Sequence, residues 1–368
     1  MQYSHGLICG VNREYLGAPL RRAAAHRRAR AGYAEALPGR AIPSCTLYRR
    51  RMSLPDLVLV ALALAFAWSM GAHYTGACMG MPYASGSIGA RAALGTMAPL
   101  TLLGAAFLSH AVLHRVGHDI VAGGNLGTAP AIAVIGAAFV LTTLFTRRRI
   151  PTSTIQILVF SLVGAGVALH LRIRWDTIAR LAVLWVLAPC LACALGWLFT
   201  RLLDALPQWA SAQRAAANVG RALVVMGALA SLAMGANDVS NATAVFLSTG
   251  LCGPLAAGLL GGIGLALGVL TWGRPLLERV AFDMVRLDLP MATAAQLVQA
   301  LVVLAAVALG YFTSMNQALI GAMAGAGLAR GRQTIDTRVI LGVLRGWLVG
   351  PAAGALLGWV FARMLRPW

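Results

Sequence analysis

Long stretches without a single charged side chain constrain the fold of this chain more than any other feature. No Asp, Glu, Lys or Arg occurs in residues 57–90, 120–146, 181–200, 239–273 or 289–329. A membrane-spanning α-helix needs about 20 mostly apolar residues, so each stretch can hold one span and the longest can hold two. The composition agrees, since 59% of the 368 residues are hydrophobic and 11% are charged, against roughly a quarter charged in a soluble domain. The sequence therefore predicts an all-α integral membrane protein.

Glycines, prolines and charges divide the apolar sequence into ten candidate segments. They lie at about 54–72, 92–113, 126–146, 151–170, 177–200, 219–236, 251–272, 292–312, 315–329 and 338–362. The ninth is too short to cross comfortably, and we expect it to be re-entrant or broken, because such backbone is tolerated at membrane depth where protein or water satisfies it. We therefore predict about ten to twelve transmembrane or re-entrant helices.

The first 51 residues form a separate basic segment that contains ten Arg. One interpretation is a tail attracted to anionic lipid, and the other is that translation begins at Met52; the sequence leaves both open. In either case, Arg49-Arg50-Arg51 before the first span favours a cytoplasmic N-terminus. The net charge of +19 lies between the apolar runs rather than on one solvated face, so we expect no nucleic-acid partner.

Comparison of the chain with itself indicates an internal repeat. The matching pairs include Gly71-Ala72 with Gly235-Ala236 at a shift of 164, Thr152-Ser153 with Thr313-Ser314 at 161, and Trp185 and Pro189 with Trp347 and Pro351 at 162. We predict two transmembrane repeats, at 52–205 and 206–368. Each contains five segments, and an odd number makes the second copy enter the membrane from the opposite side, which gives the inverted repeat of many secondary transporters.

A polar run in the second repeat is the first candidate site. Asp238 is the acid that lies deep in apolar sequence, and Asn237, Ser240 and Asn241 surround it. A carboxylate inside a membrane is costly, so it marks function unless it sits at a helix end and reaches interfacial water. These oxygens are hard ligands of the kind that a Na⁺ or proton site uses, and we expect the site at the repeat interface near the midplane.

Hydroxyl-bearing segments in both repeats are the second candidate. Thr152, Ser153 and Thr154 recur in part as Thr313 and Ser314. Hydroxyls at the start of a helix, together with free N–H groups and the positive end of the helix dipole, make an anion site. The alternative is that these hydroxyls bond their own backbone or a neighbouring helix.

The polar run closely resembles the Gly-Ala-Asn-Asp-Val-Ala-Asn-Ala signature of the inorganic phosphate transporter (PiT) family; here it reads Gly235-Ala236-Asn237-Asp238-Val239-Ser240-Asn241-Ala242. Further stretches are similar to other segments of that family, namely Gly273-Arg274-Pro275-Leu276-Leu277-Glu278 and Pro151-Thr152-Ser153-Thr154. The likeness covers about residues 52–361. It implies a symporter that takes up phosphate with Na⁺ or H⁺. Carried over by position, the resemblance makes Asp238, Asn237 and Asn241 ion and anion ligands, and it makes Ser153, Thr154 and Ser314 contacts of the anion.

The first repeat departs from the signature. It reads Gly71-Ala72-His73-Tyr74-Thr75-Gly76-Ala77-Cys78, so His73 and Tyr74 stand where the family has Asn and Asp. One carboxylate is therefore missing. His73 titrates near neutrality and could replace it as a proton carrier or anion ligand; the alternative is a neutral histidine hydrogen-bonded between helices. Tyr74 could donate to a phosphate oxygen or simply pack.

We therefore expect a multi-pass transporter of the cell membrane that carries inorganic phosphate by alternating access. The ion-coupling residues would be Asp238, Asn237, Asn241 and His73. We expect no catalytic residue, resident metal or cofactor apart from the coupling ion, H⁺ or Na⁺, and no paired carboxylates or activated nucleophile support an enzyme. Membrane lipid is the other expected partner, and the chain could form a homodimer. The rivals are a permease for sulfate or another oxyanion, and a sensor or partner subunit of the same fold that transports nothing.

Overall fold

The computed structural model describes residues 52–118, 126–148, 150, 152–205, 212–283, 288–331 and 337–365. The basic segment at 1–51 lies outside the described residues. Within these ranges the chain forms helices: α1 Leu54–His73, α2 Thr75–Ala84, α3 Ala90–Phe107, α4 His110–His118, α5 Thr128–Arg147, α6 Thr154–Ala168, α7 Trp175–Ala205, α8 Ala212–Ser248, α9 Pro254–Trp272, α10 Arg274–Asp283, α11 Leu289–Ala308, α12 Met315–Arg330 and α13 Thr337–Met364.

The predicted all-α membrane fold is confirmed. Eight helical stretches among the described residues are long and apolar enough to cross a membrane, with α1 and α2 counted as one stretch. Two predicted segments have different ends. The segment at 92–113 is divided between α3 and α4, and the segment expected to end at Ala236 continues as α8 to Ser248. The polar run stays helical because its side chains are buried and most of them have hydrogen-bond partners.

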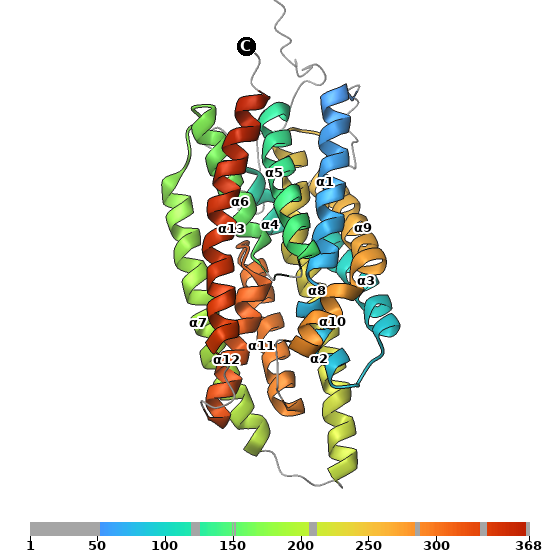
Figure 1. Cartoon of the computed structure of the whole chain (residues 1–368). Coiled ribbons are helices and arrows are strands. Elements are labelled where there is room, and N and C mark those ends of the chain that lie inside the picture. Colours follow the sequence, from blue (N-terminus) through green and yellow to red (C-terminus); the bar gives the residue numbers. More distant parts are fainter. Residues whose placement is uncertain are drawn as a thin grey trace, which may run out of the picture. The chain divides into compact units, whose positions relative to one another are not determined.

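The two halves of the chain have the same order of helices. By position, α1 with α2 corresponds to α8, and α3, α4, α5, α6 and α7 correspond to α9, α10, α11, α12 and α13. Their packing is reciprocal: α6 packs on α13 as α12 packs on α7, and α3 packs on α8 as α1 packs on α9. In Figure 1, α7 runs from top to bottom while α13 ends at the top, and α1 begins at the top while α8 begins at the bottom. The corresponding long helices therefore run in opposite directions, and the inverted repeat stays a prediction.

Glycines show the same correspondence at the level of atoms. A Cβ on Gly71 would lie 2.0 Å from the carbonyl oxygen of Leu265, and a Cβ on Gly235 would lie 1.9 Å from that of Thr101. The shift of 164 relates both members of these pairs. Small residues let two membrane helices approach until their backbones touch. Each glycine therefore sets the contact between a helix of one half and a helix of the other.

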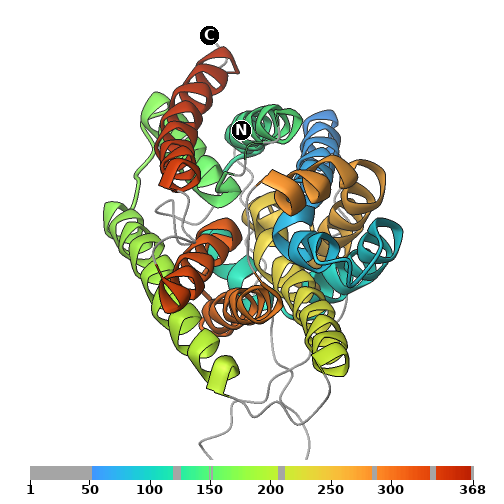
Figure 2. The same ribbon diagram turned by 60° about the horizontal axis from the view of Figure 1, so that its bottom comes forward.

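The helices form two groups around the centre (Figure 2). One group contains α1, α2, α3, α8 and α9, and the other contains α6, α7, α12 and α13. Between them lie α5, which packs on α1 and α13, and α11, which packs on α8 and α7. The starts of α6 and α12 face the first group, and the buried polar side chains gather there.

Candidate functional site

The polar run of α8 lies in the protein interior. Asn237, Asp238, Ser240 and Asn241 are at most 1% exposed. Asp238 is therefore not an acid at a helix end that reaches interfacial water, and this alternative is excluded. A buried charge or polar group needs partners from the protein or from a ligand.

One cluster joins Asp238 to the start of α6. The Asn241 Nδ2 group donates to Asp238 Oδ1 at 3.2 Å and lies 3.2 Å from Thr154 Oγ1. The Tyr74 hydroxyl is 2.7 Å from the same Thr154 oxygen. Three segments far apart in the sequence thus meet at one buried hydroxyl group.

Several oxygens around this cluster have no hydrogen-bond partner. Asp238 Oδ2 makes no hydrogen bond of normal geometry, although the Tyr74 hydroxyl and the Asn237 amide lie close enough to interact with the carboxylate. The Asn241 Oδ1 oxygen is also unpaired, as are the buried Thr152 Oγ1, Thr313 Oγ1, Gln156 Oε1 and Gln317 Oε1. Buried polar atoms are rarely left unpaired unless a ligand or water satisfies them. Unpaired carboxylate and amide oxygens are acceptors suited to a proton or a small hard cation.

A second contact joins Asn237 to the segment before α12. Its Nδ2 group donates to the Thr313 carbonyl oxygen at 2.8 Å, and its Oδ1 accepts from the Thr313 N–H at 3.0 Å. Both polar atoms of the Asn237 side chain are therefore used on one backbone unit. The contact places Ser314, the next residue, where it begins α12.

His73 makes the equivalent contact in the first half. The Thr152 N–H donates to His73 Nε2 at 3.2 Å, and His73 Nδ1 lies 2.9 Å from Thr146 Oγ1. The same Nε2 atom also lies 3.3 Å from the Thr152 carbonyl oxygen, so both polar groups of Thr152 contact one ring nitrogen. His73 thus holds Thr152 as Asn237 holds Thr313. This geometry matches the alternative of a histidine hydrogen-bonded between helices.

The two hydroxyl segments lie next to each other at the starts of short helices. Ser153 caps α6 by accepting from the Gln156 N–H, and Ser314 caps α12 by accepting from the Gln317 N–H. Each hydroxyl still has a proton to donate. The Asn316 Nδ2 group donates to the Thr152 carbonyl oxygen at 2.7 Å, which joins the two segments.

Two helix N-termini therefore meet at the centre of the protein. The first N–H groups of an α-helix have no partner within the helix, and they carry the positive end of its dipole. Together with the capping hydroxyls of Ser153 and Ser314, they present the kind of donor groups that anion sites use. These donors lie beside the buried Asp238 carboxylate, in a region of low dielectric constant.

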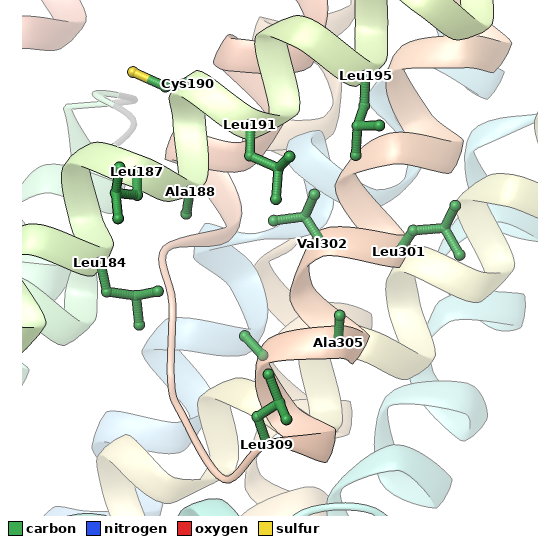
Figure 3. Close-up of a pocket in the computed structure, with 11 residues that line it drawn as sticks. Leu184, Leu187, Ala188, Cys190, Leu191, Leu195, Leu301, Val302, Ala305 and Leu309 are labelled. Atoms are coloured by element: carbon green, nitrogen blue, oxygen red, sulfur yellow. The ribbon is translucent and has the colours of Figure 1, made fainter.

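An apolar cavity elsewhere does not have this chemistry. It has a volume of about 590 Å³ and lies between α7 and α11 (Figure 3). Its walls are side chains such as Leu184, Leu187, Leu191 and Leu301, with no charged or hydrogen-bonding group among those that line it except the Cys190 thiol. Such a surface suits hydrocarbon rather than an oxyanion. Over the described ranges, no three His, Cys, Asp or Glu side chains are grouped to hold a metal ion.

The fold and the site together define a class of protein. A buried carboxylate, unpaired oxygens and facing helix N-termini lie at the centre of membrane-length helices, as in a secondary transporter built from repeats. The profile of the phosphate transporter family matches residues 70–358. The chain belongs to the phosphate transporter family. Its family and fold are those of transporters rather than enzymes, and it is a multi-pass membrane protein, as the sequence predicted.

Individual relatives agree with this assignment. A Pyrococcus furiosus protein described as a phosphate permease is 24% identical over 84% of this chain and 96% of its own length. A Mycobacterium leprae protein described as a low-affinity inorganic phosphate transporter is 28% identical over 82% of this chain and 76% of its own length. The solved structure of a sodium-dependent phosphate transporter superposes with a TM-score of 0.76 at 22% identity, and the match covers 84% of this chain and 98% of that one.

The seven residues that the sequence assigned to ion coupling or anion binding lie in this one region: His73, Ser153, Thr154, Asn237, Asp238, Asn241 and Ser314. Asn241 contacts both Asp238 and Thr154, and the others reach the region through the contacts described above. Three further buried side chains with unpaired oxygens were not among the predicted ligands, namely Gln156, Gln317 and Gln296. The repeat contains the signal for the first two, since Gln156 and Gln317 are related by the shift of 161.

Proposed function

We propose that this chain takes up inorganic phosphate in symport with H⁺ or Na⁺. The observation that carries the proposal is the position of the unpaired Asp238 oxygen beside the facing N-termini of α6 and α12. A carboxylate and an anion repel each other in a medium of low dielectric constant, and a cation bound between them removes this repulsion. Each ligand then strengthens the binding of the other, which is a coupling free energy.

The anion is held by neutral groups in this proposal. The hydroxyls of Ser153 and Ser314 donate to phosphate oxygens, together with the N–H groups of the first turns of α6 and α12. Asn237 and His73 act indirectly. Asn237 holds the backbone of Thr313 in place, and His73 holds that of Thr152. We propose that Thr154 and Asn241 contribute oxygens where the anion and the cation sites meet.

The cation site consists of Asp238 and the oxygen of Asn241. A carboxylate with a nearby amide oxygen can bind Na⁺ or take up H⁺. The sodium-dependent phosphate transporter of similar fold makes Na⁺ the first ion to test. Movement of the helix group that contains α8 against the group that contains α6 and α12 would open the site alternately to each side.

Sulfate is the alternative substrate. Phosphate is partly protonated at neutral pH and can donate a hydrogen bond, whereas sulfate cannot. The unpaired acceptors Asp238 Oδ2 and Gln317 Oε1 favour an anion that donates. Competition by unlabelled sulfate against labelled phosphate distinguishes the two permeases.

The test is labelled-phosphate uptake into proteoliposomes with an imposed Na⁺ or H⁺ gradient. We expect gradient-driven uptake by the chain from Met52, and we expect Asp238→Asn to abolish the dependence on the gradient. Asp176→Asn is the matched control, since Asp176 is an exposed acid whose partner is Arg180. Uptake by Asp238→Asn with unchanged ion dependence would refute the role of Asp238. Phosphate binding without flux, in folded protein under either gradient, would instead indicate a sensor or partner subunit.

A further inference from the structure

The two halves of the site differ in charge although their helices correspond. We define the carboxylate set as Asp238, Asn241 and Thr154, which touch one another through Asn241 Nδ2. The set combines residues of both repeats, two from α8 and one from the start of α6. Among the described residues that are buried near the site, Asp238 has the only carboxylate.

The repeat places a second set of residues at the equivalent positions. We define the neutral set as Tyr74, Ala77 and Met315, which the shifts of 164 and 161 relate to Asp238, Asn241 and Thr154 in that order. All three are at most 3% exposed. A phenol, a methyl and a thioether replace a carboxylate, an amide and a hydroxyl, so all three polar ligands have changed together.

The side chains of the neutral set are engaged elsewhere or cannot bind a hard cation. The Tyr74 hydroxyl is hydrogen-bonded to Thr154 Oγ1 at 2.7 Å and so points into the carboxylate set. Tyr74 also has the largest of the fully buried side chains and fills more space than an aspartate would. The methyl of Ala77 offers no ligand, and a thioether is a soft ligand that suits neither H⁺ nor Na⁺.

Among the described residues, no neighbour of the neutral set restores the lost charge. Gln296 on α11 donates from Nε2 to the Ala77 carbonyl oxygen at 3.0 Å, and its Oε1 is an unpaired neutral acceptor. A cation placed here would lose its hydration without a carboxylate to compensate, which costs several kcal/mol by general estimates. At Asp238 the carboxylate offsets that cost.

We propose that this chain binds one coupling cation per phosphate, at the carboxylate set, and that the neutral set binds none. The inference rests on the proposed symport and specifies its stoichiometry. With one monovalent cation for each dihydrogen phosphate, a transport cycle moves no net charge. A symmetric site with two carboxylates would bind a second cation and move one positive charge.

The experiment measures how far phosphate accumulates in proteoliposomes at zero membrane potential. The internal and external K⁺ concentrations are equal, valinomycin is present, and the pH is held low enough that dihydrogen phosphate predominates. Because the free energy of a gradient is RT ln of the concentration ratio, a tenfold gradient of the driving cation supports about tenfold accumulation with one cation and about a hundredfold with two. We expect about tenfold.

The membrane potential provides an independent measurement. A potential of 100 mV changes the free energy of transport by about 2.3 kcal/mol for each charge that moves. This free energy corresponds to roughly a fiftyfold change in accumulation. We expect almost no change when an inside-negative potential is added to the same cation gradient. A fiftyfold increase would mean that a positive charge moves, which contradicts a single cation.

Two variants test the residues. Tyr74→Phe keeps the ring and loses the hydroxyl that bonds Thr154. The accumulation ratio depends on stoichiometry and not on affinity, so we expect this ratio to stay near tenfold even where uptake is slower. Tyr74→Asp combined with Ala77→Asn rebuilds two members of the carboxylate set in the first half, and we expect accumulation to rise toward a hundredfold. If this double variant does not fold, the unmodified chain alone decides between tenfold and a hundredfold.

The outcomes separate the inference from the symport on which it rests. No gradient-driven uptake by the unmodified chain overturns both. Uptake with a hundredfold accumulation and a response to potential leaves the symport in place and overturns the single cation. Equilibrium dialysis of the purified chain with labelled cation and phosphate gives the number of bound cations per chain directly. Two bound cations per chain would also overturn the inference of a single cation.

Discussion

The contact between Asn237 and Thr313 gives the sharpest prediction about the anion site. Replacing Asn237 with Ala removes both side-chain hydrogen bonds to the Thr313 backbone, at 2.8 and 3.0 Å. The Thr313 residue is fully buried, so its N–H and C=O groups are then left without a partner from α8. Nothing else in the octapeptide reaches this backbone unit in the described contacts.

The magnitude follows from these two bonds. Hydrogen bonds between membrane helices average about 0.6 kcal/mol each, and a buried group left unpaired costs about 1–3 kcal/mol. For two bonds and two unpaired groups the sum is about 3–7 kcal/mol, which corresponds to a loss of at least about a hundredfold in an equilibrium constant. Because Thr313 precedes the Ser314 cap, we expect this loss in the apparent affinity for phosphate.

The assay is the phosphate concentration dependence of uptake in proteoliposomes, with thermal unfolding of the detergent-solubilised protein measured in parallel. Ser240→Ala is the matched control, because Ser240 is equally buried but donates only to the Asn237 carbonyl oxygen within α8. We expect less than a threefold change in phosphate affinity for this control, because the bond that is lost stays within α8. Asn237→His should recover part of the affinity, since an imidazole can accept from the backbone N–H as His73 does at Thr152. An unchanged affinity in Asn237→Ala, or an equal loss in Ser240→Ala, would refute the reasoning.

Two further predictions concern packing and the hydroxyl network. Gly235→Ala should prevent normal assembly of the helices, because the new Cβ would lie 1.9 Å from the Thr101 carbonyl oxygen. Size-exclusion chromatography should then show a loss of folded protein. The control Gly95→Ala should elute normally, because no atom lies within 4 Å of its new Cβ. Thr154→Val keeps the volume of the side chain but removes the oxygen that Tyr74 and Asn241 share. We expect phosphate affinity to fall by about tenfold or more, from loss of two buried hydrogen bonds, whereas Thr293→Val, which loses only a bond to its own helix, should have little effect.

The charge-free runs and the repeat were sufficient to predict the class of fold. Helix periodicity could not define the ends of α8, because the run from Asn237 to Asn241 is polar and a membrane segment normally excludes such side chains. The run remains helical because Thr313 and Thr154, at distant positions in the sequence, supply its partners. That pairing is a tertiary contact that no local pattern encodes.

Among the predicted ligands, the sequence identified residue types but not their roles. Asp238 and Asn237 are neighbours in one motif but differ in their contacts. Asp238 has an unpaired oxygen, whereas both polar atoms of the Asn237 side chain bond to the Thr313 backbone. The sequence shows His73 only as a titratable residue, whereas its partners Thr146 and Thr152 show that it positions the segment before α6. The distinction depends on which atoms lie within about 3 Å, which is set by helix packing.

The sequence by itself determined that this protein spans a membrane with α-helices, because a hydrocarbon environment restricts a long apolar chain to few structures. It also predicted a repeat that sets the two hydroxyl segments at corresponding positions. Only the tertiary structure brought the starts of α6 and α12 together beside α8 and turned Tyr74 toward Thr154. The physical reason is that the close backbone contacts at Gly71 and Gly235 fix how the helices of one half sit against those of the other, and the geometry of the site follows from that packing.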